Sequence, residues 1–263
     1  MKRTLLEHLP EDVPARFIRF AAGADIYDSS CSPEARVWLI DRDGGYYLKK
    51  YRAGALAREA EMTAYFHRKG LGAEVLAYHT DEFDWMLTAR VPGEDATHAM
   101  YLDDPKRLCD LFATQLRALH EVDFSDCPVT DRTGEFLHMA EENYRTGNFD
   151  TSHFPDSFGY ASAEEAYAVL SAGKSALKHD VLIHGDYCLP NVMLDGWRFS
   201  GFIDLGGAGF GNRHRDLFWG LWSLCYNLKT DRYTKRFLDA YGRDMVNTEL
   251  LRAVAALEGF GIT

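Results

Sequence analysis

Two apolar runs joined by an Asp-Gly pair constrain this chain more than any other stretch. The runs cover residues 192–194 and 199–204, and Asp195-Gly196 lies between them. An Asp-Gly pair between two apolar runs is a strong signal for a β-hairpin. The hairpin is expected to bring Asn191 and Asp204 to neighbouring positions at one end of the ribbon.

A further apolar run, 181–183, precedes the hairpin and ends in His184-Gly185-Asp186. Asp186 therefore lies on the loop that leads to Asn191 and, through the hairpin, to Asp204. Oxygen ligands of this kind suit Mg²⁺, which keeps several waters and takes other ligands from substrate phosphates. Singly, each of these residues could equally well turn or cap the chain. Together, in this order, they favour phosphoryl transfer, in which a protein positions the nucleophile and neutralises charge with metal and lysine.

The same stretch resembles the signature of the aminoglycoside phosphotransferase family, and most closely its 3′-phosphotransferase branch. The resemblance covers HGDYCLPNVMLDGWRFSGFIDLG nearly throughout and extends to Asp216. It implies an α+β, two-lobed, protein-kinase-like fold with a small β-rich N-terminal lobe and a larger, mainly helical C-terminal lobe. It also implies that Asp186 is the catalytic base, that Asn191 and Asp204 hold Mg²⁺, and that Asp216 buttresses the catalytic loop.

Composition and charge limit the class of protein. The 263 residues, 46% hydrophobic and 26% charged, are typical of a soluble globular protein with one large domain or two lobes. The net charge of −11 argues against a nucleic-acid partner. It fits a cationic small-molecule substrate and, about equally well, an acidic surface kept for solubility. A monomer or weak dimer is expected.

Cysteine spacing and hydropathy indicate the compartment. The five cysteines show no CxxC pair, which indicates neither a disulfide framework nor a zinc site. Acidic residues follow Met1 almost at once, and apolar runs of about 20 residues are missing, so neither a signal peptide nor a membrane span is expected. These features predict a cytoplasmic protein without a membrane partner.

A lysine and a glutamate in the amino-terminal third form a candidate pair. Residues 36–40 and 46–48 are rich in strand formers and flank a turn at 41–45. Lys49 ends this second strand, and Glu59 lies early in a predicted helix, 56–66. Such a pair could hold the ammonium against ATP phosphates, although isolated pairs are usually surface contacts worth little. Glu61 competes on spacing, and the family register favours Glu59.

The resemblance assigns further positions to the nucleotide, ATP or GTP. Ser32 falls in a small-residue loop, 29–33, which without a Gly-x-Gly pattern fits a plain surface turn better. Tyr47 is similar to the residue that stacks on adenine, although an ordinary strand residue would look the same. Ile203, next to Asp204, is also expected at the nucleotide.

A hinge is expected where Pro92 and Gly93 follow the strand 83–89, because proline removes a ladder donor and glycine permits a sharp turn. The resemblance implies that the backbone groups of Ala89 and Val91 meet adenine there. It divides the chain into a nucleotide-binding lobe, 1–89, a hinge, 90–94, and a lobe with the catalytic loop, metal site and acceptor region, 95–263.

Helices dominate the second half. Apolar stripes predict helices at 108–120, 137–144, 163–170, 217–228, 232–241 and 248–258. His120 is expected as a packing or capping residue, and Asp216 as the N-terminal cap of its helix. The glycine-rich run 206–211 is expected to lack regular structure and to wrap a metal-bound phosphate.

The acceptor site departs from the family pattern. Polycationic aminoglycosides need several carboxylates, yet charged family positions are Gly207, Asn212, Trp222 and Tyr226 in this chain. The predicted acceptor ligands are Asp156, Glu258 and Tyr226, and the predicted acceptor is the 3′-hydroxyl of an aminoglycoside.

Other functions stay open. Another small alcohol or amino sugar could be the acceptor, and a non-catalytic nucleotide-binding pseudokinase would be marked by loss of Asp186, Asn191 or Asp204, which are all present. A metal-dependent hydrolase lacks a histidine cluster with ligand spacing.

Overall fold

The computed structural model describes residues 3–32, 34–150 and 159–261. The chain forms two compact units, the first made of Met1–Tyr101 with Pro190–Gly206 and the second of Leu102–Leu189 with Gly207–Thr263. The boundaries expected around a hinge at 90–94 stay a prediction, because compactness does not identify a hinge. Among the described residues, none of the helices has the length and apolar character needed to cross a membrane.

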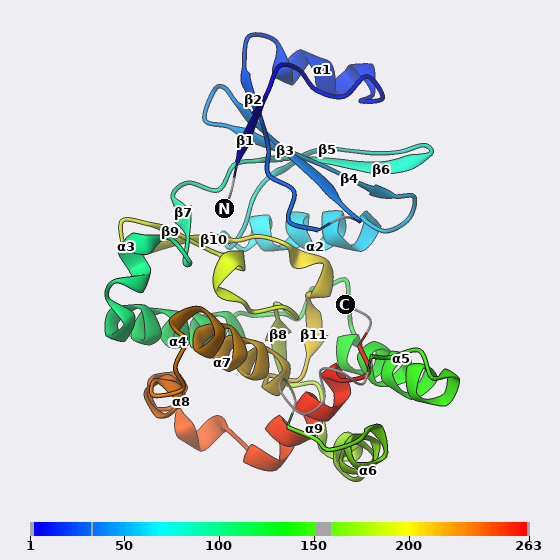
Figure 1. Ribbon diagram of the computed structural model, residues 1–263, viewed down its shortest axis with the longest axis vertical. Helices are drawn as coiled ribbons and strands as arrows, with labels where there is room; N and C mark the ends of the chain where they lie inside the picture. Colours follow the sequence, from blue (N-terminus) through cyan, green and yellow to red (C-terminus); the bar gives the residue numbers. More distant parts are fainter. Residues whose placement is uncertain (1–2, 33, 151–158, 262–263) are drawn as a thin grey trace. The chain divides into compact units, whose positions relative to one another are not determined.

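An antiparallel sheet forms the body of the first unit (Figure 1). Its six strands run in the order β1-β2-β3-β4-β6-β5. Their bounds are β1 Thr4–Leu6, β2 Asp25–Asp28, β3 Arg36–Asp41, β4 Tyr46–Arg52, β5 Val75–Thr80 and β6 Phe83–Ala89. The predicted pairing of β3 with β4 is confirmed, with Arg36 opposite Lys50 and Ile40 opposite Tyr46.

One helix packs on each face of this sheet. Alternate residues of a strand point to opposite faces, and β6 follows this rule. Its Trp85 and Leu87 join a core that contains Phe17 from α1, Ala15–Ala21. Its Met86 packs instead with Ala60 of α2, Ala57–Arg68, the helix predicted at 56–66.

The predicted hairpin is confirmed as β9, Val192–Asp195, and β10, Arg198–Phe202, with β7, Glu94–Asp95, on the other edge of β9. Its turn lies one residue later than expected, at Gly196 and Trp197, which both have positive φ. Two positive φ values are what a two-residue hairpin turn requires. Beyond the hairpin, Ile203 N–H donates to the Asn191 carbonyl at 3.1 Å, which confirms that Asn191 and Asp204 are neighbours.

The second unit is mainly helical, and each helix predicted in it is present. The helices are α4 Pro105–His120, α5 Arg132–Thr146, α6 Ala163–Gly173, α7 His214–Leu228, α8 Thr234–Tyr241 and α9 Thr248–Glu258, while α3, Ala99–Leu102, crosses the boundary between the units. Side chains cap four of these helices at their starts, namely Asp104, Asp131, Ser162 and Asn247. A core of apolar residues joins α5, α6 and α9.

A two-stranded sheet corrects the expectation for 206–211. Gly209–Gly211 is β11, and it pairs antiparallel with β8, Val181–Ile183. The expectation of an irregular run there was wrong, because glycine allows a close approach that flexibility alone does not predict. A side chain at Gly211 would lie 2.6 Å from Ile183 Cδ1, so the bare backbone is what lets these strands pair.

Candidate active site

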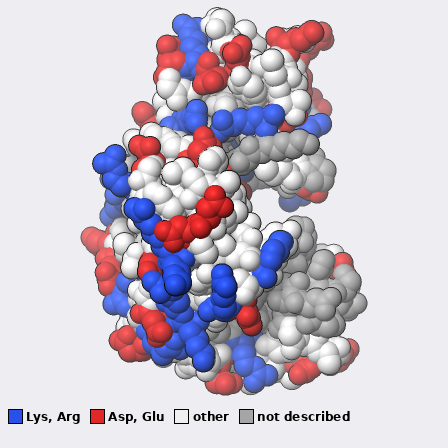
Figure 2. Space-filling model, turned by 60° about the vertical axis from the view of Figure 1, so that its left-hand side comes forward, with Lys and Arg blue, Asp and Glu red and all other residues white. Residues whose placement is uncertain are grey.

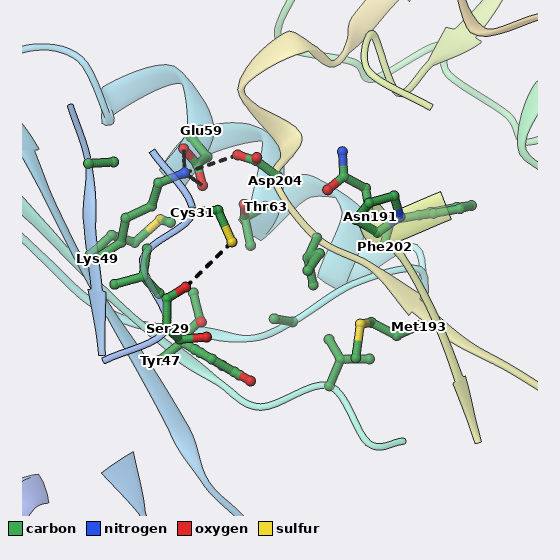
Figure 3. A pocket seen from close by; sticks show the side chains of 18 of the residues that line it. Ser29, Cys31, Tyr47, Lys49, Glu59, Thr63, Asn191, Met193, Phe202 and Asp204 are labelled. Carbon is green, nitrogen blue, oxygen red and sulfur yellow. Dashed lines mark hydrogen bonds and ion pairs between the residues drawn. The ribbon is translucent and has the colours of Figure 1, made fainter. Parts of the chain in front are cut away.

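A cavity of about 300 Å³ opens in the first unit (Figure 3). This volume is at the lower end of the range for small-molecule sites. Its lining includes every first-unit residue that the sequence predicted for nucleotide or metal: Ser32, Tyr47, Lys49, Glu59, Ala89, Val91, Asn191, Ile203 and Asp204. The sequence therefore predicted residues from distant segments that the fold gathers around one cavity.

Lys49 is the centre of the charged end of this cavity. Its Nζ lies 2.9 and 2.8 Å from the two carboxylate oxygens of Glu59 and 3.0 Å from Asp204 Oδ1, as the dashed lines in Figure 3 show. Burial by itself would lower the pKa of Lys49, but the carboxylates of Asp204 and Glu59 outweigh it, so this pKa lies well above its ordinary value. The lysine is therefore a fixed positive charge in the cavity.

The predicted pairing of Lys49 with Glu59 is confirmed. Glu59 is 7% exposed, whereas Glu61 is exposed, because the helix turns the two side chains to different faces. The sequence predicted that Lys49 ends its strand, and this was wrong. Lys49 lies within β4, opposite Met86 of β6. A position inside the sheet fixes the lysine stem more firmly than a strand end would.

Asn191 and Asp204 line the same cavity, and the Asp204 carboxylate points toward the Lys49 ammonium (Figure 3). Asp204 has φ of 60°, a backbone conformation that non-glycine residues adopt rarely and that occurs often at functional sites. Its side chain is 52% exposed, and that of Asn191 lines the same cavity. One carboxylate and one amide oxygen beside a nucleotide cavity fit Mg²⁺, which takes few protein ligands and completes its shell with phosphates and water.

The loop before β3 is ordered by its own side chains. Ser30 N–H donates to Asp28 Oδ1 at 2.9 Å, Val37 N–H to Ser30 Oγ at 3.0 Å, and Ala35 N–H to Ser32 Oγ at 3.3 Å. Such local bonds fix a turn without a Gly-x-Gly pattern. The loop thus contributes Ser29, Cys31 and Ser32 to the cavity wall.

Asp186 belongs to the second unit, on the loop that follows β8. Its N–H donates to His184 Nδ1 at 3.3 Å, and the Cys188 thiol donates to Asp186 Oδ1 at 3.1 Å. Further along, Leu189 N–H donates to Ser223 Oγ of α7 at 2.9 Å. Side chains inside and outside the loop therefore set its path.

Asp216 supports this loop from α7. The N–H groups of His184 and Gly185 each donate to its carboxylate at 2.7 Å, and its side chain is fully buried. The expectation that Asp216 buttresses the loop is confirmed, whereas the expectation that it caps its helix was wrong. The helix begins earlier, at His214, and its first residues show no side-chain cap.

His120 extends the support of Asp216. Its Nε2 lies 3.2 Å from Asp216 Oδ2, and its Nδ1 lies 2.7 Å from the Tyr241 hydroxyl. The prediction that His120 is a packing residue is confirmed.

The three predicted acceptor ligands differ in their surroundings, where the structure describes them. Asp156 lies outside the described residues. Glu258 is 6% exposed and forms an ion pair with Arg215. Burial raises the pKa of the Glu258 carboxyl, against the Arg215 guanidinium, which lowers it. Tyr226 is 57% exposed, and its ring stacks on Trp222 with the centroids 5.1 Å apart. The acceptor roles of all three residues stay predictions.

Comparison with known proteins identifies the family. A model described as "Phosphotransferase enzyme family" matches residues 29–256. This chain belongs to that family. It is 48% identical over 239 residues, 90% of this chain and 91% of the relative, to a protein of Lactococcus lactis subsp. lactis (strain IL1403) named "Probable aminoglycoside 3'-phosphotransferase".

Two solved structures confirm the fold of this phosphotransferase. The first, an aminoglycoside-3'-phosphotransferase of type VIII, is 26% identical with a TM-score of 0.74 and covers 89% of this chain and 91% of its own. The second is an aminoglycoside phosphotransferase from Streptomyces rimosus ATCC10970 in complex with ADP and streptomycin. It is 25% identical with a TM-score of 0.68, over 86% and 90% of the two chains. The expected α+β, protein-kinase-like fold is confirmed.

Several residues around the phosphotransferase sites were not predicted. In the first unit, Thr63, Met193 and Phe202 also line the cavity. The sequence does contain a signal for Met193, because side chains alternate between the two faces of β9 and the strand therefore assigns Met193 to one face. In the second unit, Cys188, Ser223 and Arg215 contact the Asp186 loop. The bond of Cys188 is local, to Asp186 two residues earlier, whereas the contacts of Ser223 and Arg215 depend on how α7 packs and leave no comparable signal in the sequence.

Proposed function

We propose that this phosphotransferase transfers the γ-phosphoryl group of ATP to the 3′-hydroxyl of an aminoglycoside. The observation that carries the proposal is the cluster of Lys49, Glu59 and Asp204 in a cavity that Asn191 also lines. This is the set of groups that phosphoryl transfer needs for charge neutralisation. The names of the relatives, and the ADP in one solved complex, support the choice of nucleotide and acceptor.

In this proposal the first unit binds the nucleotide. Lys49 binds the phosphates, Glu59 holds the lysine, and Ser32 lies at the phosphate loop. Tyr47 and Ile203 contact the adenine, and the backbone of Ala89 and Val91 hydrogen-bonds it. Asn191 and Asp204 would hold Mg²⁺, which when bound neutralises the charge that develops on the phosphates. GTP could replace ATP without any change in these roles.

Asp186 is the proposed base for the acceptor. The hydroxyl oxygen forms a bond to the γ-phosphorus, and the bond from that phosphorus to the bridging oxygen breaks, with ADP as the leaving group. The hydroxyl proton passes to the Asp186 carboxylate. Because only five positions separate Asp186 from Asn191, a short peptide joins the proposed base to the proposed metal ligands.

The acceptor is proposed to be a cationic amino sugar held by Asp156, Glu258 and Tyr226. The Arg215 guanidinium already neutralises Glu258, so Glu258 has less charge to offer than an isolated carboxylate. The Lys229 ammonium lies 3.9 Å from the centre of the Tyr226 ring, which shows that this ring can accept a cation. Acidic and basic side chains intermingle on the face shown in Figure 2, so on that face the net charge of −11 is not concentrated in one patch.

The division into lobes at 1–89 and 95–263 with a hinge between them is part of this proposal. So is a cytoplasmic location, where ATP is supplied and where the free thiols of the five cysteines would stay reduced. A monomer or weak dimer is proposed as the working form.

Nucleotide turnover tests the proposal. Wild type and Asp186→Ala are assayed with ATP and Mg²⁺ against a panel of aminoglycosides, with choline, homoserine and simple amino sugars beside them. We expect turnover with an aminoglycoside that falls by about 10³-fold or more in Asp186→Ala, the contribution of a general base at the upper part of its range, while ATP still binds. Turnover confined to another alcohol would overturn the acceptor. ATP binding without turnover on any acceptor would favour a pseudokinase.

A further inference from the structure

Two arginines stack on one buried phenylalanine in the second unit. Phe136 of α5 is 5% exposed. The guanidinium carbon of Arg132, one turn earlier on the same helix, lies 3.9 Å from the centre of its ring, and that of Arg215 on α7 lies 3.4 Å from it. A planar guanidinium on an aromatic face keeps its N–H groups available at the edge for hydrogen bonds.

Each arginine donates a hydrogen bond from its guanidinium edge to the carbonyl of a glycine. Arg215 Nε donates to the carbonyl of Gly185 at 2.8 Å, and Arg132 Nε donates to the carbonyl of Gly207 at 3.1 Å. The two glycines also touch, since a side chain on Gly207 would come within 3.1 Å of the Gly185 carbonyl carbon. The arginines therefore hold two backbone segments against each other.

The two glycines adjoin the residues of the proposed chemistry. Gly185 directly precedes Asp186, and Gly207 follows Asp204 by three positions. Neither arginine has a role in the proposed reaction, so the proposed function does not account for their bonds to these two glycines.

A carboxylate fixes each arginine. Glu258 of α9 pairs with Arg215, and the two side chains are 4% and 13% exposed. Glu135 pairs with Arg132 at 2.6 Å. Buried arginine is expensive unless it is paired and hydrogen-bonded, and here the carboxylate, the ring and the glycine carbonyl together satisfy it.

We propose that Arg215 and Arg132, stacked on Phe136, form a clamp that positions the Asp186 loop. They are positioning residues, with Glu258 as the support of Arg215, and the proposal rests on Asp186 as the base of the proposed function. The carbonyl and the N–H of Gly185 are then both held from α7, the carbonyl by Arg215 and the N–H by Asp216. A base fixed in this way does not have to be ordered when substrate binds.

Hydrogen exchange tests the clamp without reference to activity. Arg215→Lys keeps the positive charge but loses the planar guanidinium, which stacks on the Phe136 ring and at the same time donates to the Gly185 carbonyl. We expect the Gly185 amide to exchange at least about 10-fold faster than in wild type, while amides of α4 keep their rates. Arg132→Lys is the second variant, used if Arg215→Lys does not fold. Unchanged exchange at Gly185 in the folded variant would overturn the clamp, even if the protein phosphorylates no acceptor.

Kinetics give the second readout. If the proposed function holds, kcat of Arg215→Lys should fall about 10- to 100-fold, as expected for a slightly misplaced base, and KM for ATP should change by less than about 2-fold. The matched control is Arg145→Ala. Arg145 lies on α5, as Arg132 does, and like Arg132 it pairs with a glutamate three positions away, Glu142, but its side chain is 70% exposed. A wild-type kcat in Arg215→Lys, or an equal loss in Arg145→Ala, would contradict the clamp.

Discussion

The two candidate regions of this phosphotransferase are built in different ways. In the first unit, the carboxylates of Glu59 and Asp204 both pair with the Lys49 ammonium at the wall of a cavity. In the second unit, Asp216 and Arg215 bind the backbone of the loop that carries Asp186. The first region places its charged side chains directly at the cavity, whereas the second orders the backbone of a loop.

This contrast predicts different consequences of substitution. Changes in the first region should weaken ligand binding and leave the fold intact. Changes in the second should loosen or unfold the loop and reduce turnover without touching the nucleotide.

Gly185→Ala should have the largest effect. Gly185 has φ of 84°, and a side chain there would overlap the carbonyl of Gly207. Because backbone cannot move aside as a flexible side chain can, we expect a loss of more than about 4 kcal/mol in the free energy of unfolding. Urea denaturation measures it. Gly147→Ala is the matched control, with φ of 73° but nothing within 4 Å, and should lose about 1 kcal/mol. Equal losses would mean that the contact with Gly207 is unimportant.

Asp216→Ala should cost about 4 kcal/mol of stability, because it leaves two buried N–H groups without an acceptor and His120 without its carboxylate. Thermal and urea unfolding both report it. Asp216→Asn retains one acceptor oxygen and should lose less. If Asp216→Asn and Asp216→Ala are both as stable as wild type, the loop is not held from α7.

His214, at the start of the helix that carries Asp216, should make stability depend on pH. Its Nδ1 lies 2.8 Å from Asn212 Oδ1, and its Nε2 accepts from Asn247 N–H at 2.9 Å. Burial lowers the pKa of His214 from 6.5 to about 4. Between pH 6.5 and about 4, His214 therefore binds a proton in the unfolded chain but not in the folded one. The free energy of unfolding falls as the pH decreases through this window, in total by about 3 kcal/mol.

Unfolding free energies of wild type and His214→Gln between pH 7 and 4 measure this term. The variant cannot take up the proton, so its stability should change less across the window. Parallel curves for the two proteins would show that His214 does not titrate as expected.

Lys49→Ala should have the smallest effect on the fold and a moderate one on function. Burial already raises the pKa of Glu59, so its carboxylate can bind a proton once the ammonium is gone instead of staying charged without a partner. Loss of a charged hydrogen-bond donor to phosphate costs about 2 kcal/mol, which is roughly a 30-fold decrease of kcat/KM for ATP. Lys50→Ala is the control, since Lys50 lies on the other face of β4, over the ring of Phe83. If Lys49→Ala lowers the free energy of unfolding but not kcat/KM for ATP, the first region would be structural and would not differ from the second.

Local patterns predicted the elements well. The helices of the second unit and the strands β3, β6, β9 and β10 follow from hydrophobic periodicity and turn residues, because those signals act within a few residues. The helix start at His214 and the turn at Gly196 and Trp197 differ from expectation by one to three positions. Residues 4–28 were not divided into β1, α1 and β2, since these short elements depend on packing against Trp38 and Trp85.

The sequence by itself determined which residue types are available for the proposed chemistry. Lys49, Asp186, Asn191 and Asp204 are there as residue types in a given order, and their resemblance to a family needs no coordinates. The proximity of Asn191 to Asp204 also followed, because a hairpin relates its two ends by local geometry, and the bond from Ile203 N–H to the Asn191 carbonyl reflects it.

Only the tertiary structure decided how the Asp186 loop is held. The family resemblance already implied that Asp216 supports the loop, and the structure adds which groups bind it, the N–H groups of His184 and Gly185. Gly209–Gly211 becomes a strand because Val181–Ile183 lies beside it. Arg132 and Arg215, distant in sequence, meet on Phe136. These contacts join segments whose separation along the chain leaves no periodic or local signal, so packing alone selects them.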